Sequence, residues 1–502
     1  MPAKGDLYDV IVVGAGNAAM VAALSAAQQG ASVLVLEASG PEDQGGNTRY
    51  AAGQMRAVYS SVDDIRRLVP DLTDAEIAGS DFGTYSREDY LDDVMRLTEH
   101  RCDPDLTETL VDNSFAALSW MKDVGVRFQV SFGRQAAKVD GRFKFWGGLP
   151  FEVWGGGPGL LDAYYRAASK ANIEIVQRAF VTDLRMRDGR VTGVSCRIGG
   201  QQREIASSAV VLACGGFEAS AEMRARYLGP NWDLAKVRGT RFNTGEGLKM
   251  ALAAGASTAG HWSGAHSTCW DMNAPDSGDL IVGDGYQKFS YPVGIMVNNR
   301  GDRFVDEGAD LQTFTYAKIG REILAQPGLA AWQVFDQRAV PFLRDEYRIK
   351  KITKALGATL EELVERMEGV NRDHFLKTVT DYNAAVPPGD PPINLSVKDG
   401  RSTRGLTTQK SNWAYPIDKG PFMAFGVTTG ITFTFGGLRI STRAQVLDHA
   451  REPIPGLFAA GEIVGGIYYS GYPGGTGLVS GAVFGRIAGR EAANTRNGNR
   501  AV

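Results

Sequence analysis

Gly14, Gly16 and Glu37 are the residues whose types and spacing point most directly to chemistry. Gly14 permits a tight turn out of a strand, and Gly16 lets the backbone approach a pyrophosphate. The N–H groups at the start of the following helix favour such an anion. Glu37 follows about 20 residues later, where a carboxylate accepts hydrogen bonds from ribose hydroxyls. These residues predict a dinucleotide-binding site.

The elements that must position these residues are a strand, a helix and a second strand. The apolar run Tyr8–Val13 predicts a buried parallel strand. The alanine-rich stretch Met20–Ala27 predicts a helix, and Ala31–Leu36 predicts a second strand that ends on Glu37. Ala19 replaces the third glycine of the usual fingerprint and still lets helix and strand pack closely. An acidic ribose partner fits FAD or NAD and argues against a 2′-phosphate.

The bulk composition narrows the class of protein. A chain of 502 residues exceeds what one hydrophobic core usually supports, so we expect two domains. The composition, 43% hydrophobic and 22% charged with 62 glycines, fits an α/β enzyme. The net charge of −3 gives no electrostatic reason to expect nucleic acid or an anionic membrane as partner.

The cysteines and the N-terminus suggest the compartment. The four cysteines stand far apart with no CxxC pair, so we expect no iron–sulfur cluster, haem attachment or other metal site, and a reducing environment. The N-terminus shows no signal-peptide pattern, and no apolar stretch approaches the roughly 20 residues that span a bilayer. We expect a soluble, cytoplasmic protein without membrane insertion.

Several later segments resemble the fumarate reductase and succinate dehydrogenase flavoprotein superfamily, and they do so in the family's order along nearly the whole chain. They are Gly45–Met55, Val210–Phe217, Gly245–Ala251, Gly456–Glu462 and Gly474–Leu478. The resemblance implies FAD rather than NAD, and no second glycine fingerprint predicts a separate NAD(P)H domain. It implies a Rossmann-like, glutathione-reductase-type FAD-binding domain at 1–260 and 430–502, interrupted by an α+β capping domain at 261–429. Within the cap, residues from about Leu356 to Val386 predict a helical stretch.

The fingerprint and the resemblance together give the predicted cofactor contacts. Asn47 stands where family members with covalent flavin carry a histidine, so we expect non-covalent FAD. Glu462 is expected to reach the ribityl chain, and the helix start at Thr476 to face the pyrimidine edge. The full predicted set is Gly14, Ala15, Gly16, Asn17, Ala18, Glu37, Ala38, Gly46, Asn47, Thr48, Ala52, Gly53, Ala213, Gly215, Gly461, Glu462, Thr476, Gly477 and Leu478.

The predicted substrate site departs from the fumarate reductase pattern. Thr432 takes the place of a substrate histidine, and Tyr472 takes the place of an arginine. Where the catalytic arginine is expected, the chain reads Thr313–Lys318, while His266 is retained. Losing these cations removes the charge-assisted clamp that a small dicarboxylate needs, which disfavours fumarate and succinate.

Two groups within the superfamily share these departures. Trp262–His266, Thr315–Lys318 and Ile431–Gly437 resemble FAD-dependent tricarballylate dehydrogenases, which oxidise a tricarboxylate to cis-aconitate and pass electrons to a separate partner. Tyr472–Gly474, with Tyr316 as a partner tyrosine, resembles 3-ketosteroid Δ1-dehydrogenases. We favour the first group. An oxygen-using flavin oxidase is a further alternative, and the electron acceptor is expected to be a separate protein or a quinone.

The expected chemistry assigns a role to each of five residues. Flavin N5 would accept a hydride while a base removes a proton from the neighbouring carbon, which a carboxylate or carbonyl makes acidic. Tyr472 and Thr432 are predicted hydrogen-bond donors, and Tyr316 the proton-transfer residue. His266 and Arg303 are predicted substrate contacts. Simpler interpretations are packing for Tyr316, a structural histidine at His266, and an ion pair of Arg303 with Glu307.

Overall fold

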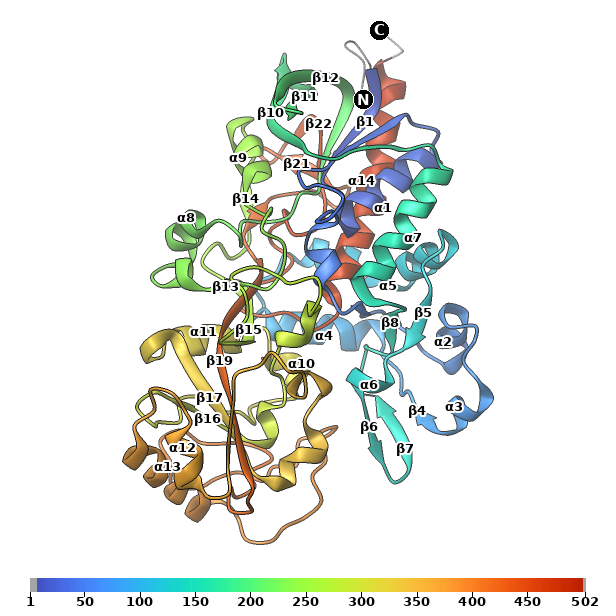
Figure 1. Cartoon of the computed structure of the whole chain (residues 1–502). Helices are drawn as coiled ribbons and strands as arrows, with labels where there is room; N and C mark the ends of the chain where they lie inside the picture. Colours follow the sequence, from blue (N-terminus) through green and yellow to red (C-terminus); the bar gives the residue numbers. More distant parts are fainter. Residues whose placement is uncertain (1–6, 146, 500–502) are drawn as a thin grey trace. The chain divides into compact units, whose positions relative to one another are not determined.

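The computed structural model describes residues 7–145 and 147–499, and the chain divides into two compact units (Figure 1). The split unit comprises Met1–Gly229, Gly239–Ala265 and Phe433–Val502. The inserted unit comprises Pro230–Arg238 and His266–Thr432. Among the described residues, no helix combines the length and apolar character needed to cross a bilayer.

A sheet with parallel central strands forms the base of the split unit. Its order is β10-β11-β12-β1-β2-β9, and β22 also pairs with β12. The pairs β12–β1, β1–β2, β2–β9 and β12–β22 are parallel, whereas β10, β11 and β21 pair antiparallel. The strands are β1 Leu7–Val13, β2 Val33–Leu36, β9 Glu174–Val176, β10 Ala179–Arg187, β11 Arg190–Ile198, β12 Gln201–Leu212, β21 Gln445–Leu447 and β22 Pro453–Ala459. The predicted strand–helix–strand unit is confirmed as β1, α1 and β2.

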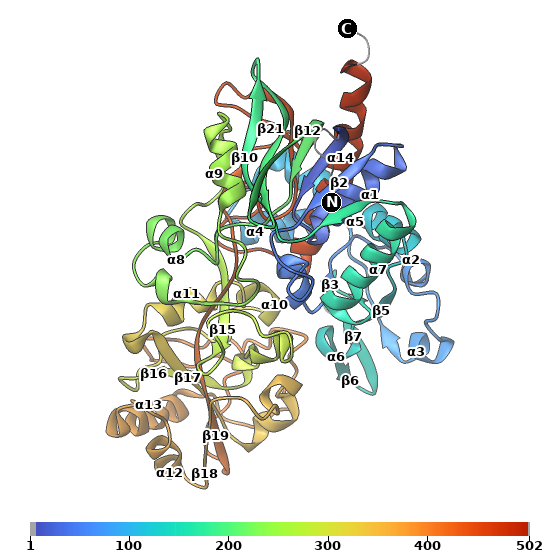
Figure 2. The ribbon, with the colours of Figure 1, turned by 45° about the horizontal axis from the view of Figure 1, so that its top comes forward.

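Two helices from opposite ends of the chain pack together under the dinucleotide loop. α1 is Asn17–Gln28 and α14 is Thr476–Asn499, and both views place them side by side (Figures 1 and 2). Glycines recur every four residues on the face of α14 turned to α1. A Cβ added to Gly485 would lie 2.7 Å from the Ala18 carbonyl oxygen, and one on Gly489 would lie 2.1 Å from that of Ala22. The small residues therefore let the two backbones approach closely, which fixes the start of α1.

The remaining elements of the split unit are helices and short strands around this base. The helices are α2 Val62–Leu68, α3 Asp74–Ala78, α4 Arg87–Leu97, α5 Pro104–Asp123, α6 Phe132–Gln135, α7 Gly156–Lys170, α8 Ala221–Met223 and α9 Glu246–Ala253. The strands are β3 Gln54–Met55, β4 Ser80–Asp81, β5 Phe128–Val130, β6 Ala136–Val139, β7 Arg142–Phe145, β8 Phe151–Val153, β14 Thr258–Ala259 and β20 Gly437–Leu438.

A mixed sheet centred on a long strand, β19, organises the inserted unit. β19 spans Phe422–Thr434, and the sheet order is β13-β19-β17-β16, with β15 and β18 also paired to β19. The other elements are β13 Lys236–Val237, β15 Ala265–Asp271, β16 Ile295–Asn298, β17 Ala330–Phe335, β18 Lys354–Gly357, α10 Gln312–Thr315, α11 Ile319–Leu324, α12 Leu360–Glu365 and α13 Arg372–Ala385.

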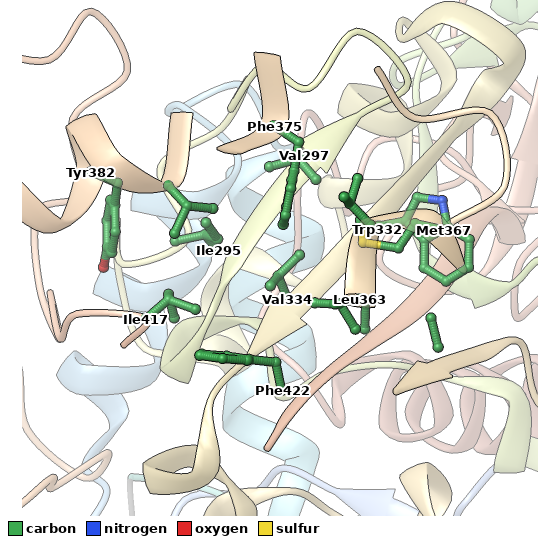
Figure 3. Close-up of a cluster of buried hydrophobic side chains, with 14 residues drawn as sticks. Ile295, Val297, Trp332, Val334, Leu363, Met367, Phe375, Tyr382, Ile417 and Phe422 are labelled. Carbon is green, nitrogen blue, oxygen red and sulfur yellow. The ribbon is translucent and has the colours of Figure 1, made fainter. Parts of the chain in front are cut away.

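The core of the inserted unit lies between this sheet and the helices α12 and α13. Trp332 and Val334 of β17 point to the same face, as the two-residue period of a strand requires. Figure 3 shows Trp332 beside Met367, and Phe375 beside Val297, in this cluster of buried apolar side chains. On the opposite face of β17, Phe335 packs with a second apolar cluster.

The prediction of one helical stretch from Leu356 to Val386 is wrong in detail. Leu356 belongs to β18, which pairs with β19, and two helices follow instead of one. Thr359 and Asn371 each accept a hydrogen bond from a backbone N–H in the first turn of α12 and α13. Gly369, with a φ of +77°, lies between the helices in a left-handed conformation that a helix does not continue. Local capping therefore divides the stretch.

Candidate functional site

The loop between β1 and α1 has the close backbone approach predicted for a phosphate-binding turn. Gly14 has a φ of +105°, and a Cβ there would lie 2.5 Å from the Ala213 carbonyl oxygen. Gly16 is the N-cap residue of α1, so the first N–H groups of the helix face out of this loop. The Asn17 N–H donates to Thr48 Oγ1 at 2.9 Å, which brings two predicted cofactor-binding segments together.

Asn17 also ties this loop to the C-terminal helix. Its Nδ2 donates to the Leu478 carbonyl oxygen at 2.7 Å, and its Oδ1 accepts from the Tyr164 hydroxyl at 3.0 Å. Three segments that are distant in sequence therefore converge on one amide side chain.

Glu37 lies just after β2, where the fingerprint requires an acidic residue. One of its carboxylate oxygens, Oε1, accepts from both the N–H and the hydroxyl of Ser39. This fixes the carboxylate and leaves Oε2 to accept from a ribose. A surface cavity of about 570 Å³ lies along β9 next to this turn; it is lined by Pro41, Glu174–Val176, Gln177 and Arg178. Backbone hydrogen bonds join Glu37 to Val176 and Ala179.

The segment from Gly45 to Gly53 forms an open turn next to α7. Gly45 and Gly46 have φ values of +108° and +55°, and a Cβ on Gly46 would meet no atom within 4 Å. By contrast, a Cβ on Gly53 would lie 2.9 Å from the Gly156 Cα. Gly46 therefore borders open space, while Gly53 permits close packing. Asn47, on the same turn, donates to Glu218 Oε1 at 2.7 Å and accepts from the Thr240 N–H at 2.9 Å.

Two glutamate side chains meet behind Asn47. Glu218 is fully buried, and the Asn243 amide donates to Glu218 Oε1 at 2.6 Å and to Glu462 Oε2 at 3.4 Å. Glu462 also accepts from the Thr434 N–H at 2.9 Å. Burial raises the pKa of both carboxyl groups, and their mutual contact adds to the rise at Glu462. Sequence reasoning identified Glu462 but missed Glu218, although it directly follows the Gly215–Phe217 segment.

A buried arginine holds the loop that opens α14. Arg56 is fully buried, its Nε donates to the Gly474 carbonyl oxygen at 2.8 Å, and its backbone N–H donates to that of Gly475. The Tyr90 hydroxyl donates to Thr476 Oγ1 at 3.2 Å. The predicted pyrimidine-facing loop is thus fixed on two sides. Arg56 was missed because it lies far from the loop in sequence.

Tyr472 lies in an aromatic cluster of the split unit. It is 8% exposed, and its ring centroid lies 5.2 Å from that of Phe433 and 5.3 Å from that of Tyr468. Gly477 is close enough that an added Cβ would contact the Tyr472 ring. The predicted donor therefore lies beside the predicted flavin loop.

In the inserted unit, three of the predicted site residues gather around an arginine. Arg238 Nη1 donates to Thr432 Oγ1 at 3.2 Å. His266 is buried, and its ring lies 5.0 Å from that of Tyr316 in an edge-to-face contact. Burial, and secondarily the charge of Arg238, hold the His266 pKa well below its usual range, so the imidazole is neutral at physiological pH. Arg238 carries no family motif and was missed by sequence reasoning.

The Arg238 guanidinium is oriented by acidic and aromatic neighbours. It forms an ion pair with Asp284 at 2.6 Å and lies over the rings of Trp270 and Phe289. Tyr316 packs edge-on against the same Phe289 ring. Arg344 lies within 5.8 Å of the centre of that ring as well. Two guanidinium groups and one predicted catalytic side chain, that of Tyr316, thus contact one phenylalanine.

A buried lysine supports the loop that carries Asp284. Lys288 Nζ donates to the carbonyl oxygens of Gly285, Tyr286 and Gln287, and lies 3.8 Å from Asp271. Burial lowers the pKa of Lys288 to about 8.

Arg303 lies elsewhere in the inserted unit, in the arrangement of a structural ion pair. It contacts both carboxylate oxygens of Glu307 and donates to the Thr408 carbonyl oxygen. Glu307 in turn accepts from the Met296 N–H. This geometry matches the simpler of the two sequence interpretations, and a substrate contact at Arg303 stays a prediction.

The chain matches the family model described as FAD binding domain over residues 9–479, and it belongs to this family. Among curated relatives, it is 30% identical over 491 residues to the probable fumarate reductase Ifc3 of Shewanella frigidimarina (strain NCIMB 400), covering 96% of this chain and 74% of that protein. It is 28% identical to 4-oxocyclohex-2-ene-1-carboxylate 5-dehydrogenase of Sinomonas cyclohexanicum, covering 97% and 93%.

Relatives differ in length. The match to NADH:fumarate oxidoreductase of Klebsiella pneumoniae (strain 342), at 28% identity, covers 98% of this chain and 48% of that protein, so the chain spans about half its length.

Solved structures show the same fold. The open conformation of a flavocytochrome c3 fumarate reductase matches with a TM-score of 0.71 at 28% identity, over 98% of this chain and 79% of that one. 3-Ketosteroid-Δ4-(5α)-dehydrogenase from Rhodococcus jostii RHA1 matches with a TM-score of 0.71 at 26% identity, over 98% of both chains. The predicted superfamily and α/β fold class are confirmed, and the protein is an FAD-dependent oxidoreductase of the fumarate reductase family that acts on C=C or CH–CH bonds.

The residues present in the split unit fit FAD. The open space at Gly46, the start of α1 after Gly16 and the fixed carboxylate of Glu37 suit a pyrophosphate and a ribose. The sequence predicted these groups as FAD contacts, and their contacts with FAD stay predictions.

Proposed function

We propose that the protein oxidises or reduces a CH–CH bond next to a carboxylate, with the oxidation of tricarballylate to cis-aconitate as its preferred reaction. The split unit would bind FAD without a covalent bond, and the inserted unit would be the cap that supplies substrate contacts. The expected segments 1–260 and 430–502 would bind FAD and 261–429 would be the cap, with Arg238 and Thr432 from the flanking segments added to the inserted unit. The observation that carries the proposal is the Arg238 guanidinium beside Thr432.

Arg238 supplies the cation that the sequence alone did not reveal. Asp284 orients the guanidinium, so that Nη1 and the Thr432 hydroxyl together present donors on one edge. A carboxylate on that edge would form charge-assisted hydrogen bonds, which are about twice as strong as neutral ones. Aromatic walls and partial burial lower the local dielectric and strengthen the attraction further.

A polycarboxylate needs more than one cation, and the same cluster offers a second. Arg344 lies over Phe289 as Arg238 does, and its Nη2 donates to Gln312 Oε1 at 2.9 Å. The neutral His266 adds a hydrogen-bonding group without charge. Two guanidiniums around one ring favour a substrate with at least two carboxylates.

The predicted residues divide the proton chemistry between them. FAD, when bound, supplies the hydride acceptor or donor. Tyr316 is our choice for the residue that removes the proton, because it packs against both His266 and Phe289 in the cluster. Thr432 and Tyr472 are the predicted hydrogen-bond donors to substrate oxygens.

Non-covalent flavin is part of the proposal. The Asn47 amide is engaged by Glu218 and the Thr240 N–H, and an amide is not the nucleophile that a flavin linkage requires. Acid precipitation should therefore release all of the flavin into the supernatant, measured by its absorbance. Flavin that stays with the precipitate would contradict this.

A second candidate is a ring ketone that also bears a carboxylate. The aromatic surroundings of Tyr472, formed by Phe433 and Tyr468, suit an apolar ring, and the Tyr472 hydroxyl suits a ketone oxygen. The relative from Sinomonas is named for a substrate with both groups. In this case Arg238 would bind the single carboxylate.

Anaerobic bleaching of the flavin tests the proposal. Tricarballylate is mixed with the oxidised protein under argon, and the flavin absorbance is followed against a panel of dicarboxylates, carboxylated cyclohexenones and steroids. We expect bleaching by tricarballylate first. If only a carboxylated ketone bleaches the flavin, the second candidate is correct. If a steroid without a carboxylate bleaches it, Arg238 does not serve as the carboxylate-binding residue. Admitting air then separates a dehydrogenase from an oxidase, which reoxidises at once and releases peroxide.

A further inference from the structure

The buried glutamate pair of the split unit has a feature that neither the fold nor the proposed function uses. Glu218 Oε2 is buried, and within the described residues no N–H or hydroxyl donates to it. The carboxyl groups of Glu218 and Glu462 lie close together, because the Asn243 Nδ2 donates to Glu218 Oε1 at 2.6 Å and to Glu462 Oε2 at 3.4 Å. A side-chain hydrogen bond between the two carboxyl groups contributes to the pKa shift of each. Two carboxylates cannot form a hydrogen bond to one another unless one of them carries a proton.

The hydrogen-bond donors identified for the carboxyl oxygens of the pair, among the described residues, are neutral groups. Glu218 Oε1 accepts from the amides of Asn47 and Asn243, both neutral. Glu462 accepts from the Thr434 N–H, and Cys214 nearby is held as a neutral thiol because burial raises its pKa to about 12. Arg224 is the cation closest in the chain, and its Nη1 donates to the Glu218 backbone carbonyl oxygen.

Both members of the pair are joined to predicted flavin contacts. Glu218 accepts a hydrogen bond from the amide of Asn47, which is itself a predicted FAD contact. Glu462 is itself predicted to reach the ribityl chain and, unlike Glu218, is partly exposed. The inner carboxyl therefore holds the outer one and Asn47 in place.

We propose that Glu218 and Glu462 share a single proton, so that the pair presents one negative charge at the flavin site, and that Glu218 is a positioning residue for Glu462 and Asn47. Like charges in a buried contact cannot both ionise, which fixes the proton count at one. The inference is independent of the substrate.

The charge of the pair can be counted through the flavin midpoint potential. The holoprotein is titrated by dye-linked reduction at pH 8 in wild type, Glu218→Gln, Glu462→Gln and the double variant. The amide of a glutamine can donate a hydrogen bond to the remaining carboxylate but cannot ionise. Each single variant therefore keeps one negative charge. We expect the single variants to match wild type and the double variant to have a higher potential.

Other patterns would overturn the proposal. A stepwise rise from wild type to single to double variants means two charges in the wild-type pair, and no rise in any variant means none. Glu204→Gln, an exposed glutamate on β12, is the matched control and should leave the potential unchanged.

The positioning role has a separate test in FAD affinity. Glu218→Leu removes the acceptor of both amides, and the dissociation constant of FAD should rise about tenfold or more, as for a lost buried hydrogen-bond partner. Glu218→Gln keeps the acceptor, and its dissociation constant should stay within about threefold of wild type. Difference infrared spectra of wild type minus Glu218→Gln at pH 8 should show the carbonyl band of a protonated carboxylic acid. Equal affinity in the Leu and Gln variants, or no such band, would falsify the inference.

Discussion

The two units of the protein differ in the groups that they place at their predicted ligand sites. The split unit buries the carboxyl pair Glu218–Glu462 and positions its predicted ligand mainly through backbone groups around Gly14 and Gly16. The inserted unit buries cations, of which Lys288 and Lys410 have a pKa lowered to about 8 by burial, and presents Arg238 through a side chain. A ligand recognised by backbone N–H groups leaves a glycine signature in the sequence. One recognised by a side-chain cation leaves no local pattern.

The largest effect on flavin content and stability is expected at Gly14, where two backbone segments of the split unit lie in close contact. Gly14→Ala places a Cβ 2.5 Å from the Ala213 carbonyl oxygen at a φ of +105°. We expect FAD to be lost and unfolding to be easier by more than about 3 kcal/mol, since the clash adds to roughly 1–2 kcal/mol of left-handed strain. The ratio of flavin to protein absorbance and urea unfolding measure both.

Gly200→Ala is the matched control. Gly200 also has a positive φ, +80°, but an added Cβ there meets no atom within 4 Å. Its cost should be confined to the strain, with full flavin content. If both variants lost flavin and stability equally, the effect of Gly14→Ala would come from backbone strain alone and not from the close approach to Ala213.

The next effect addresses the inserted unit. Arg238→Met should lower kcat/KM for the true substrate by about 30-fold to 5,000-fold, because a lost charged pair costs roughly 2–5 kcal/mol. Flavin content should not change. Arg238→Lys should recover part of the activity, and Arg241→Met, at an exposed ion pair with Asp43, should have no effect. A loss below threefold in Arg238→Met would remove this residue from the substrate site.

A smaller effect follows from the buried lysines of the inserted unit. The pKa of Lys410 is lowered to about 8 in the folded protein from about 10.5 unfolded, so the unfolded chain binds more protons between these values. The free energy of unfolding therefore rises with pH in that window, by up to about 3 kcal/mol per lysine. The carboxyl pair acts in the opposite direction above pH 4.5, because its folded pKa is raised.

Urea unfolding of Lys410→Met at pH 7 and pH 10 isolates this contribution. The variant should show a smaller rise in stability than wild type over the interval. An identical rise would mean that the Lys410 ammonium, which donates to the carbonyl oxygen of Pro292, is not destabilised by burial.

The smallest effect concerns a helix end in the inserted unit. Asn371→Ala removes the N-cap of α13 and should lower stability by about 1 kcal/mol. Asn371→Asp should restore it, and neither change should alter flavin content or kcat/KM. A change in turnover would connect this helix to the chemistry and weaken the separation of roles between the units.

Sequence patterns predicted the parts of the fold that local chemistry determines. The Gly14–Gly16 turn, β1, α1 and β2 follow from glycine conformations and apolar periodicity within about 30 residues. Glu218 was missed because its functional importance depends on its contact with Glu462, and only folding brings these two residues together. The same holds for Arg238, whose partners Asp284 and Thr432 come from separate segments.

Errors arose where a local pattern had two solutions. From Leu356 to Val386 the helical tendency is real, but the capping of Thr359 and Asn371 and the pairing of β18 with β19 divide it. Arg303 is a different case, because its contacts with Glu307 match the expected ion pair while a substrate contact stays a prediction.

The junction of Asn17 with the start of α14 has a consequence for how the protein is made. The amide of Asn17 donates to Leu478, 461 positions further along the chain, and β22 pairs with β12 only when it too has been synthesised. A ribosome that adds about 5–20 residues per second leaves the nucleotide loop without these supports for roughly 20 seconds or longer. During that interval the inserted unit is already available to fold. The nucleotide loop therefore gains its last supports only after α14 has been synthesised.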